Sequence, residues 1–286
     1  MLCHTCDTEN DPRTNECETC RTPVGAPVLR PDVPVRTVRG IGRAAAVAVG
    51  AATLAFLLST LALPVQAAIA AEAGHRLDSD LLLTVQLLDL AGVPYVVGML
   101  IAAVLVIIWT WRARMNLDAF PGAGATVSAG WAIAGWLVPI ANFFMPYRVV
   151  ANVARESLWR LTTPRLVNLW WTGWVVFLIW DRIVGGRVAQ RWETLPQAPQ
   201  TAVEFQAYTD HYTAALDSYV VPTAACLVAG VSLIVLIVRI SAAQEARIAR
   251  SLPSGPILPG SVVPAPTHPP VASPPAPGVA GGTIGA

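Results

Sequence analysis

The sequence predicts an all-α integral membrane protein with four transmembrane helices, a re-entrant or interfacial segment, a small cysteine-rich N-terminal module and a disordered C-terminal tail. Three observations lead to this fold class. The 286 residues are 54% hydrophobic and 13% charged, with a mean hydropathy of +0.54, whereas a soluble domain has about 25% charged residues. Long uncharged stretches recur along the chain, and four of the five cysteines lie within the first twenty residues. This composition excludes an ordinary soluble enzyme and a wholly disordered chain.

The N-terminal cysteines have the spacing of a metal site. Cys3-x-x-Cys6 and Cys17-x-x-Cys20 are separated by ten residues, and two such knuckles place four thiolates around one tetrahedral Zn²⁺ ion. The metal supplies folding free energy that so short a segment could not obtain from a hydrophobic core. We therefore predict a structural zinc ribbon over residues 1–21 with one zinc per chain. A redox pair or a stray cysteine cluster is the alternative.

The charge of this module bears on its partners. Arg13 is the only basic residue between the first and the last cysteine, and a four-thiolate zinc centre adds negative charge to the acidic side chains. Phosphate binding depends on cations, so the sequence disfavours nucleic acid and favours a protein contact or a structural cap. A closed four-thiolate site also has no open position for catalysis. The acidic residues of this segment are Asp7, Glu9, Asp11, Glu16 and Glu18.

Asp7 and Arg21 directly follow the second cysteine of their knuckles, a position where zinc knuckles commonly have glycine.

Four stretches are apolar enough for transmembrane helices, which need about 20 residues to cross the hydrocarbon core. Trp109 and Trp111 close the second stretch, and tryptophan is typical of the lipid–water boundary. The third stretch is the shortest and reaches full length only if Asp181 and Arg182 lie at the interface. The four stretches are residues 44–71, 90–111, 166–180 and 218–238.

Residues 129–147 are also long enough to cross, but Pro139, Asn142 and Pro146 interrupt them. Proline deletes a backbone donor, and irregular backbone at membrane depth is tolerated only where protein or water satisfies its polar groups. We therefore predict a re-entrant or interfacial segment. Its break is either a structural hairpin sealed by aromatic residues or a binding site like those of discontinuous transporter helices.

The arginines orient the predicted helices. All 19 basic residues are arginine, and four spans with both termini in the cytoplasm place 15 of them on the inner side. A fifth crossing at residues 129–147 would leave 11 inside and 8 outside, so the positive-inside rule favours four spans in the cell membrane. Residues 150–161 have the spacing of an amphipathic helix on the inner leaflet. We expect Arg148, Arg155 and Arg160 to contact its lipids.

The composition of the chain divides it into segments. The zinc ribbon is followed by a proline-rich extended linker over residues 22–40, the multi-pass membrane domain over residues 41–250 and a tail over residues 251–286. Ten of the 24 prolines and no charged residue lie in that tail, which predicts disorder or polyproline II. The first residues lack the pattern of a secretory signal, so we expect no cleaved leader.

Residues around the broken segment carry a family resemblance. Their most specific part is the pattern GW-x-x-P-x-x-N-x-x-x-P. From about Leu54 to Arg247, the chain resembles actinobacterial multi-pass membrane proteins catalogued as the domain of unknown function number 4328. The resemblance implies a membrane-embedded domain in an actinobacterial inner membrane, often preceded by a short cysteine-rich or proline-rich tail, and it implies no activity. The candidate binding or structural motif comprises Arg112, Arg114, Asn116, Trp131, Trp136, Pro139, Asn142 and Pro146.

We expect a non-enzymatic function, because no catalytic triad or phosphate-binding loop is visible. The favoured hypothesis is a membrane-anchored interaction or scaffold protein whose ribbon and tail recruit cytoplasmic protein partners, and a homo-oligomer is a further expectation. The alternative is a small transporter or channel subunit that uses the Pro139/Asn142/Pro146 break. Asp89 and Asp181 lie only at the ends of apolar stretches, which argues against a solute path. A metal site in the outer loops is less favoured than solvated side chains; its candidates are His75, Asp78, Asp80, Asp210 and His211.

Overall fold

The computed structural model describes residues 1–90 and 92–251 of the chain. Regular structure in these residues is helical, apart from isolated bridges in residues 1–23, so the all-α prediction is confirmed for them. The predicted tail lies outside the described residues except for Ser251. The elements are α1 (Arg39–Arg76), α2 (Ser79–Asp89), α3 (Gly92–Ala119), α4 (Trp131–Leu137), the 3-10 helix η1 (Ala141–Phe143), α5 (Met145–Ser157), α6 (Arg165–Glu193), α7 (Ala202–Ser218) and α8 (Val220–Arg250).

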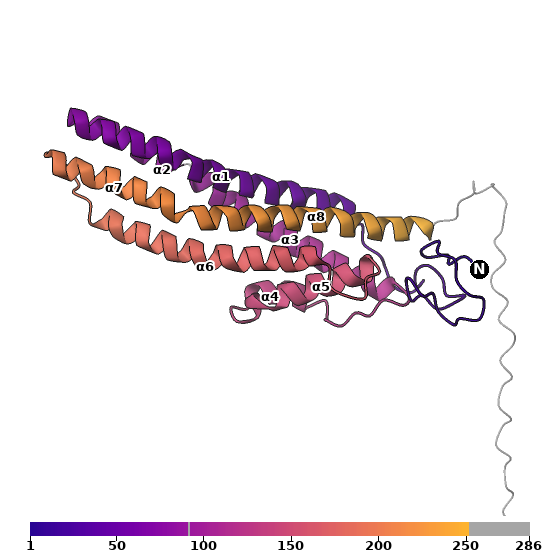
Figure 1. The fold of residues 1–286 in the computed structure, drawn as a ribbon. Coiled ribbons are helices and arrows are strands. Elements are labelled where there is room, and N and C mark those ends of the chain that lie inside the picture. Colours follow the sequence, from indigo (N-terminus) through magenta and orange to yellow (C-terminus); the bar gives the residue numbers. More distant parts are fainter. Residues whose placement is uncertain (91, 252–286) are drawn as a thin grey trace, which may run out of the picture. The chain divides into compact units, whose positions relative to one another are not determined.

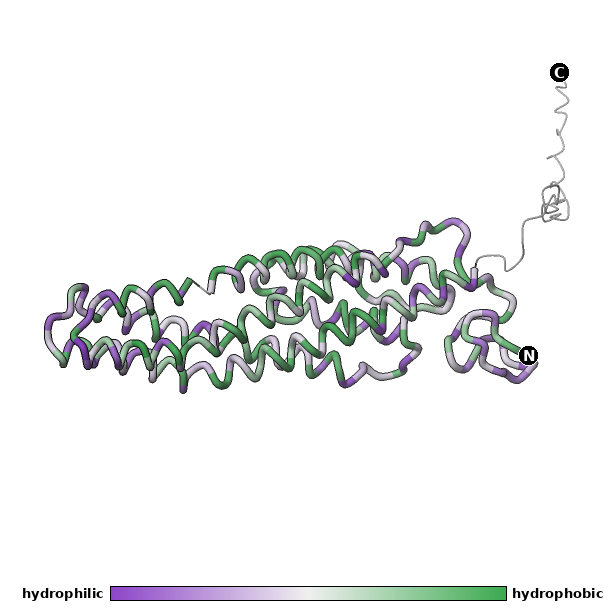
Figure 2. The backbone as a smooth tube through the Cα atoms, turned by 90° about the horizontal axis from the view of Figure 1, so that it is seen from above, coloured by the Kyte–Doolittle hydropathy of each residue, from purple (hydrophilic) through white to green (hydrophobic). Residues whose placement is uncertain are grey.

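The long helices form a bundle. In it, α1 packs against both α3 and α8, and α8 also packs against α6 (Figure 1). Hydrophobic residues line the middle of these helices, and hydrophilic residues gather at the helix ends and in the N-terminal residues (Figure 2). Three stretches are long and apolar enough to cross a membrane, namely Arg39–Arg76, Ser79–Ala119 and Ala202–Arg250. They contain three of the four predicted spans.

The fourth predicted span, residues 166–180, lies within α6. This helix has 29 residues, which corresponds to a length of about 43 Å, but it is not among the three sufficiently apolar stretches of the described residues. Its tryptophans, together with Asp181 and Arg182, lower its mean hydropathy. Length and packing therefore agree with the prediction, whereas composition alone does not establish a span.

A second hydrophobic core lies at the end of the bundle formed by α2 and α7, which we call the far end. With 38 residues, α1 is about 57 Å long and therefore extends well beyond a hydrocarbon core of about 30 Å. The sequence around Tyr208 suggests an extension of the last span, and α7 leads into α8 with only Tyr219 between the two helices. Helix α7 also packs on α1. This core comprises Ala70, Ala73, Leu82, Val85, Phe205, Tyr208 and Tyr212.

The predicted break in residues 129–147 is confirmed. Helix α4 ends at Leu137 because Val138 is extended, with ψ 117°, as the residue before a proline prefers to be. The chain turns through η1 and restarts as α5, with Pro146 in its first turn. With seven residues, α4 rises only about 10 Å. The segment is therefore a helical hairpin and no continuous crossing helix.

Helix α5 corrects the prediction of an amphipathic surface helix. It ends at Ser157 and is buried on nearly all sides. The Asn152 side chain, 1% exposed, donates to the carbonyl oxygen of Gly124 at 2.8 Å. The polar face expected to meet the inner leaflet thus binds protein. Arg148 and Arg160 are exposed and Arg155 is half-buried, so their lipid contacts stay a prediction.

Trp109 also differs from its predicted place at the lipid–water boundary. Its side chain is fully buried, and its Nε1–H donates to the hydroxyl oxygen of Ser241 at 2.9 Å. A Cβ atom built on Gly42 would lie 2.5 Å from Ser241 Oγ and 3.3 Å from the Trp109 ring, so the glycine permits the close packing of α1 on α8 and α3. The ring therefore joins three helices in the core.

The predicted linker has turns near Gly25 and Asp32, so it is extended only in part, and its last two residues belong to α1. It lies along α3. The backbone N–H of Arg36 donates to the side-chain oxygen of Asn116 at 2.7 Å, and the Asn116 amide donates back to the Arg36 carbonyl at 2.9 Å. Further along, the N–H of Arg30 donates to the carbonyl oxygen of Ala119 at 2.9 Å. Val38 is fully buried. These contacts fasten the linker to the bundle.

Candidate functional site

The four N-terminal cysteines come together as predicted. We call residues 1–22, the predicted ribbon together with Thr22, the cysteine module. The Sγ atoms of Cys3 and Cys20 are 3.5 Å apart, as are those of Cys6 and Cys17, and all four sulfur atoms lie within 4.8 Å of one another. A tetrahedral ion with metal–sulfur bonds of about 2.3 Å places its ligands about 3.8 Å apart. The cluster therefore fits one metal ion.

Local backbone geometry produces the two knuckles. The N–H of Cys3 donates to the Thr8 carbonyl at 3.0 Å, and the N–H of Cys17 donates to the Thr22 carbonyl at the same distance. Asp7 and Arg21 are left-handed, with φ of 58° and 57°, a conformation that costs most residues about 1–2 kcal/mol. The turn thus requires the glycine-like conformation although glycine is absent at both positions.

The thiols differ in acidity. Burial raises the pKa of Cys20 to about 12, in spite of its hydrogen bonds with Thr22. Burial also opposes ionisation of Cys17, but backbone N–H groups of Cys20 and Thr19 donate to its sulfur and bring its pKa down to about 6. Hydrogen bonds of this kind favour the thiolate, which is the form that binds metal.

The cysteine module packs against helix ends and the loop after α3. The Thr22 hydroxyl and the Arg247 guanidinium both donate to the carbonyl oxygen of Pro121, at 3.4 and 2.8 Å. Arg250 donates to the Thr5 carbonyl at 2.6 Å. Gly122, with φ +80°, lies so close that an added Cβ would collide with the Arg21 carbonyl. The module is therefore held through specific contacts.

Ion pairs reinforce this contact. Arg21 Nη2 lies 3.0 Å from Glu156 Oε2, which also accepts the N–H of Gly124 at 3.1 Å. Arg250 Nε lies 3.3 Å from Asp7 Oδ2. The residues with left-handed backbone are thus the residues that pair with the bundle. Sequence reasoning missed this, because no local pattern links residues that are 135 positions apart.

Three residues of the candidate motif have structural roles in α3. Asn116 is fully buried and donates to Gln244 Oε1 at 2.9 Å. Arg114 pairs with Asp118 at 2.9 Å and donates to the Val127 carbonyl. Arg112 donates to the Thr37 carbonyl at 3.4 Å. These side chains fasten the linker, the following loop and α8 to α3.

The remaining motif residues divide between surface and interior. Trp131 and Pro139 are exposed, and Pro146 is buried at the start of α5. Trp136 and Asn142 line a mostly apolar cavity of about 370 Å³ between α1, α3, α6 and α8. Trp136 Nε1 and Asn142 Oδ1 are buried without a hydrogen-bond partner among the described residues.

At the far end, the structure gathers residues that sequence reasoning did not connect. Asp89, Asp181 and His211 line one cavity of about 800 Å³, although they lie in three separate helices. Their local sequences contain no shared motif that could have revealed this. The outer-loop metal site is not formed, since Cys3, Cys6, Cys17 and Cys20 are the only group in residues 1–90 and 92–251 placed to hold a metal.

Comparison with known proteins identifies a family. The family model described as a domain of unknown function (DUF4328) matches residues 75–242, which is more than half of the chain and includes the broken segment. No curated protein and no solved structure matches the chain. The cysteine module lies outside the matched residues, whereas its partners Pro121 and Glu156 lie inside them. This chain therefore belongs to the DUF4328 family.

Proposed function

We propose that this protein is a non-enzymatic, membrane-anchored interaction protein whose metal-bearing cysteine module presents an acidic surface to a basic segment of a cytoplasmic protein. The observation that carries this proposal is the division of the module into two faces. Thr5 and Thr22 are buried against the bundle. The other face has exposed carboxylates without an ion pair among the described residues. They are Glu9, Asp11, Glu16 and Glu18.

We propose zinc as the metal. Structural zinc sites are typically tetrahedral and often consist of four cysteine thiolates. Such a site leaves no coordination position for a substrate, which supports a binding function. The metal would hold both knuckles together and thereby maintain the acidic face.

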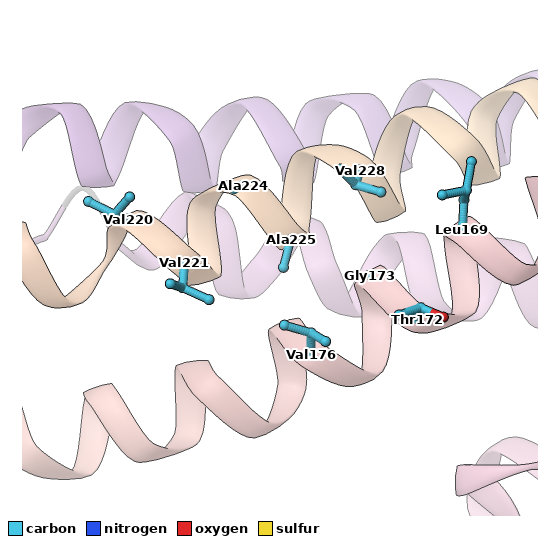
Figure 3. Close-up of a pocket in the computed structure, with 9 residues that line it drawn as sticks. All are labelled: Leu169, Thr172, Gly173, Val176, Val220, Val221, Ala224, Ala225 and Val228. Carbon is cyan, nitrogen blue, oxygen red and sulfur yellow. The ribbon is translucent and has the colours of Figure 1, made fainter.

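We also propose that α6 is the fourth span and that the cysteine module is cytoplasmic. Large apolar side chains of α6 point outward, among them Leu169, which is 51% exposed, and Ile179, which is 49% exposed. Between α6 and α8 lies a shallow apolar groove of about 380 Å³, where Gly173 approaches the backbone of Ala225 (Figure 3). Lipid chains would cover such a groove. Four spans also keep 15 of the 19 arginines on the side of the module, as the positive-inside rule expects for the cytoplasmic side.

Cysteine labelling tests this topology. Leu161 and Val203 flank α6 and are 87% and 81% exposed. A membrane-impermeant maleimide applied to intact cells should label Val203→Cys, whereas Leu161→Cys should react only after lysis. Labelling of both positions in intact cells would contradict the fourth span.

In-cell crosslinking tests the interaction function. Reversing the charges of Glu16 and Glu18 to lysine should remove protein crosslinks, because a basic partner would then be repelled. The matched control reverses Asp210 and Asp217, which are equally exposed on α7. An unchanged set of crosslinked proteins in the Glu16→Lys/Glu18→Lys variant would reject the proposal.

A second candidate function is a small transporter or channel subunit that uses the broken segment. Trp136 and Asn142 favour it, because both residues line an apolar cavity between the helices and each has a buried polar atom without a partner among the described residues. Replacing Asn142 with Leu and Pro139 with Ala should then reduce solute flux into proteoliposomes. Unchanged flux in both variants would count against transport.

A further inference from the structure

We propose that the cavity at the far end binds an organic ammonium ion, namely an amine with an N–H group attached to an apolar body. We call it the Asp89–Asp181 cavity. It measures about 800 Å³ and lies between α1, α2, α3, α6 and the α7–α8 pair. Cavities of roughly 300–1,000 Å³ are typical of small-molecule sites. The proposal is independent of the cysteine module and of any partner that it binds.

The charge of the lining calls for a cation. Asp89 accepts hydrogen bonds from the Gln66 amide at 2.8 Å and the Tyr212 hydroxyl at 3.0 Å, and both donors are neutral. Neither Asp89 nor Asp181 forms an ion pair within the described residues. Glu193 adds a third carboxylate, and no arginine lines the cavity. Asp89 is exposed and Asp181 is half-buried, so a cation that enters the cavity would meet carboxylates that have no salt bridge of their own and would be attracted to them.

The aromatic lining suits an organic cation with an apolar body. The ring centroids of Phe56 and Tyr95 are 4.9 Å apart, and those of Phe56 and Tyr219 are 6.4 Å apart. Trp192 and Tyr212 line the same cavity. Aromatic faces attract ammonium groups and cover hydrocarbon. A bare metal ion fits poorly, because no group of ligand atoms within the described part of the cavity is close enough to hold one.

His211 points to an amine that carries hydrogen. Its side chain is only 6% exposed, and its Nδ1 atom is buried with no hydrogen-bond partner in residues 1–90 and 92–251. The ring is fixed by Trp192 and Tyr212, with centroid distances of 5.7 and 5.0 Å. An unpaired imidazole nitrogen can accept an N–H group, which a quaternary ammonium ion lacks.

Binding of matched probes tests the proposal. The full-length protein in phosphatidylcholine nanodiscs is equilibrated by dialysis with phenethylammonium or with neutral 2-phenylethanol. We expect phenethylammonium to bind at least tenfold more tightly. Asp181→Asn and Asp89→Asn should each weaken its binding tenfold or more. The control Asp210→Asn removes an exposed carboxylate outside the cavity and should change nothing.

The role of His211 has its own readout. Replacing His211 with Phe keeps an aromatic ring and removes the hydrogen-bond acceptor. The variant should bind phenethylammonium severalfold more weakly and should bind its N-trimethyl derivative as tightly as the unmodified protein does. Asp181 has no side-chain hydrogen bond to a described residue, so Asp181→Asn should fold normally, which circular dichroism checks. Equal binding of the amine and the alcohol, or undiminished amine binding in both aspartate variants, would overturn the proposal.

Discussion

The two ends of the helix bundle differ in how their carboxylates are partnered. At the module end, Glu156 is paired with Arg21 and with a backbone N–H. At the far end, Asp89 and Asp181 face a cavity and have no ionic partner among the described residues. The paired and buried Glu156 stabilises a contact within the protein, because removing one partner would leave an uncompensated buried charge, whereas the two aspartates have no ion pair to lose. The module end is thus organised for assembly, and the far end for binding a cation.

Removing two ligands should produce the largest effect at the module end. In Cys17→Ser/Cys20→Ser, we expect the metal content to fall from one ion per chain to none, because a structural site contributes on the order of 10 kcal/mol of apparent binding free energy. Elemental analysis of the purified protein measures this. Cys226→Ala, which alters a cysteine of α8 outside the cluster, should retain the metal. Full metal content in the double variant would show that the cluster is not the site.

Gly122→Ala tests whether close contact holds the module. The substitution adds left-handed strain and a collision with the Arg21 carbonyl, together costing about 2–4 kcal/mol. Trypsin should then cut after Arg21 about 30-fold faster or more, because local opening limits cleavage. In Gly124→Ala, the new Cβ would lie 3.8 Å from Glu156 Oε1, an ordinary contact. Equal cleavage rates in the two variants would argue against docking.

A double-mutant cycle measures the Arg21–Glu156 pair. The Glu156 side chain is 8% exposed but that of Arg21 is 40% exposed, so solvent screens the pair. We expect a coupling free energy of about 1–2 kcal/mol. The cycle uses Arg21→Ala, Glu156→Ala and the double variant, followed by the same cleavage assay. Additive effects would mean that the pair does not contribute to docking.

Asp181→Asn should have the smallest effect on stability, and any change should be a gain, whereas Glu156→Gln should cause a loss. Because Asp181 has no ionic partner among the described residues, we expect an unfolding free energy unchanged within about 0.5 kcal/mol, or raised. Thermal unfolding in detergent compares it with Glu156→Gln, which should destabilise. A similar loss of thermal stability in both variants would contradict the proposed difference between the two ends.

Local patterns in the sequence predicted the local features of the molecule. The spacing of Cys3, Cys6, Cys17 and Cys20 is enough to predict the cluster, because each knuckle closes within a few residues. Pro139 likewise ends α4 through its effect on the preceding residue. These predictions needed no knowledge of distant contacts.

Features that depend on helix packing could not be predicted in this way. Asp89 and Asp181 lie at the ends of separate apolar stretches, and hydropathy does not reveal that α2 and α6 bring them to one cavity. The polar residues of α5 suggested a lipid-facing surface, yet Asn152 and Glu156 bind a loop of the protein. Periodicity identifies a polar face but not the group that satisfies it.

The left-handed turns at Asp7 and Arg21 suggest how to distinguish docked from mobile modules among related chains. Glycine would form each turn with less strain, but it has no side chain to reach Glu156 or Arg250. Each knuckle therefore has a more strained turn than glycine would give, and in return its side chain can bind the bundle. In a relative with glycine at both positions, the module would keep its metal and lose its hold on the bundle. The residues at positions 7 and 21 take no part in metal binding, but their identity would then indicate whether the module moves with the membrane domain or apart from it.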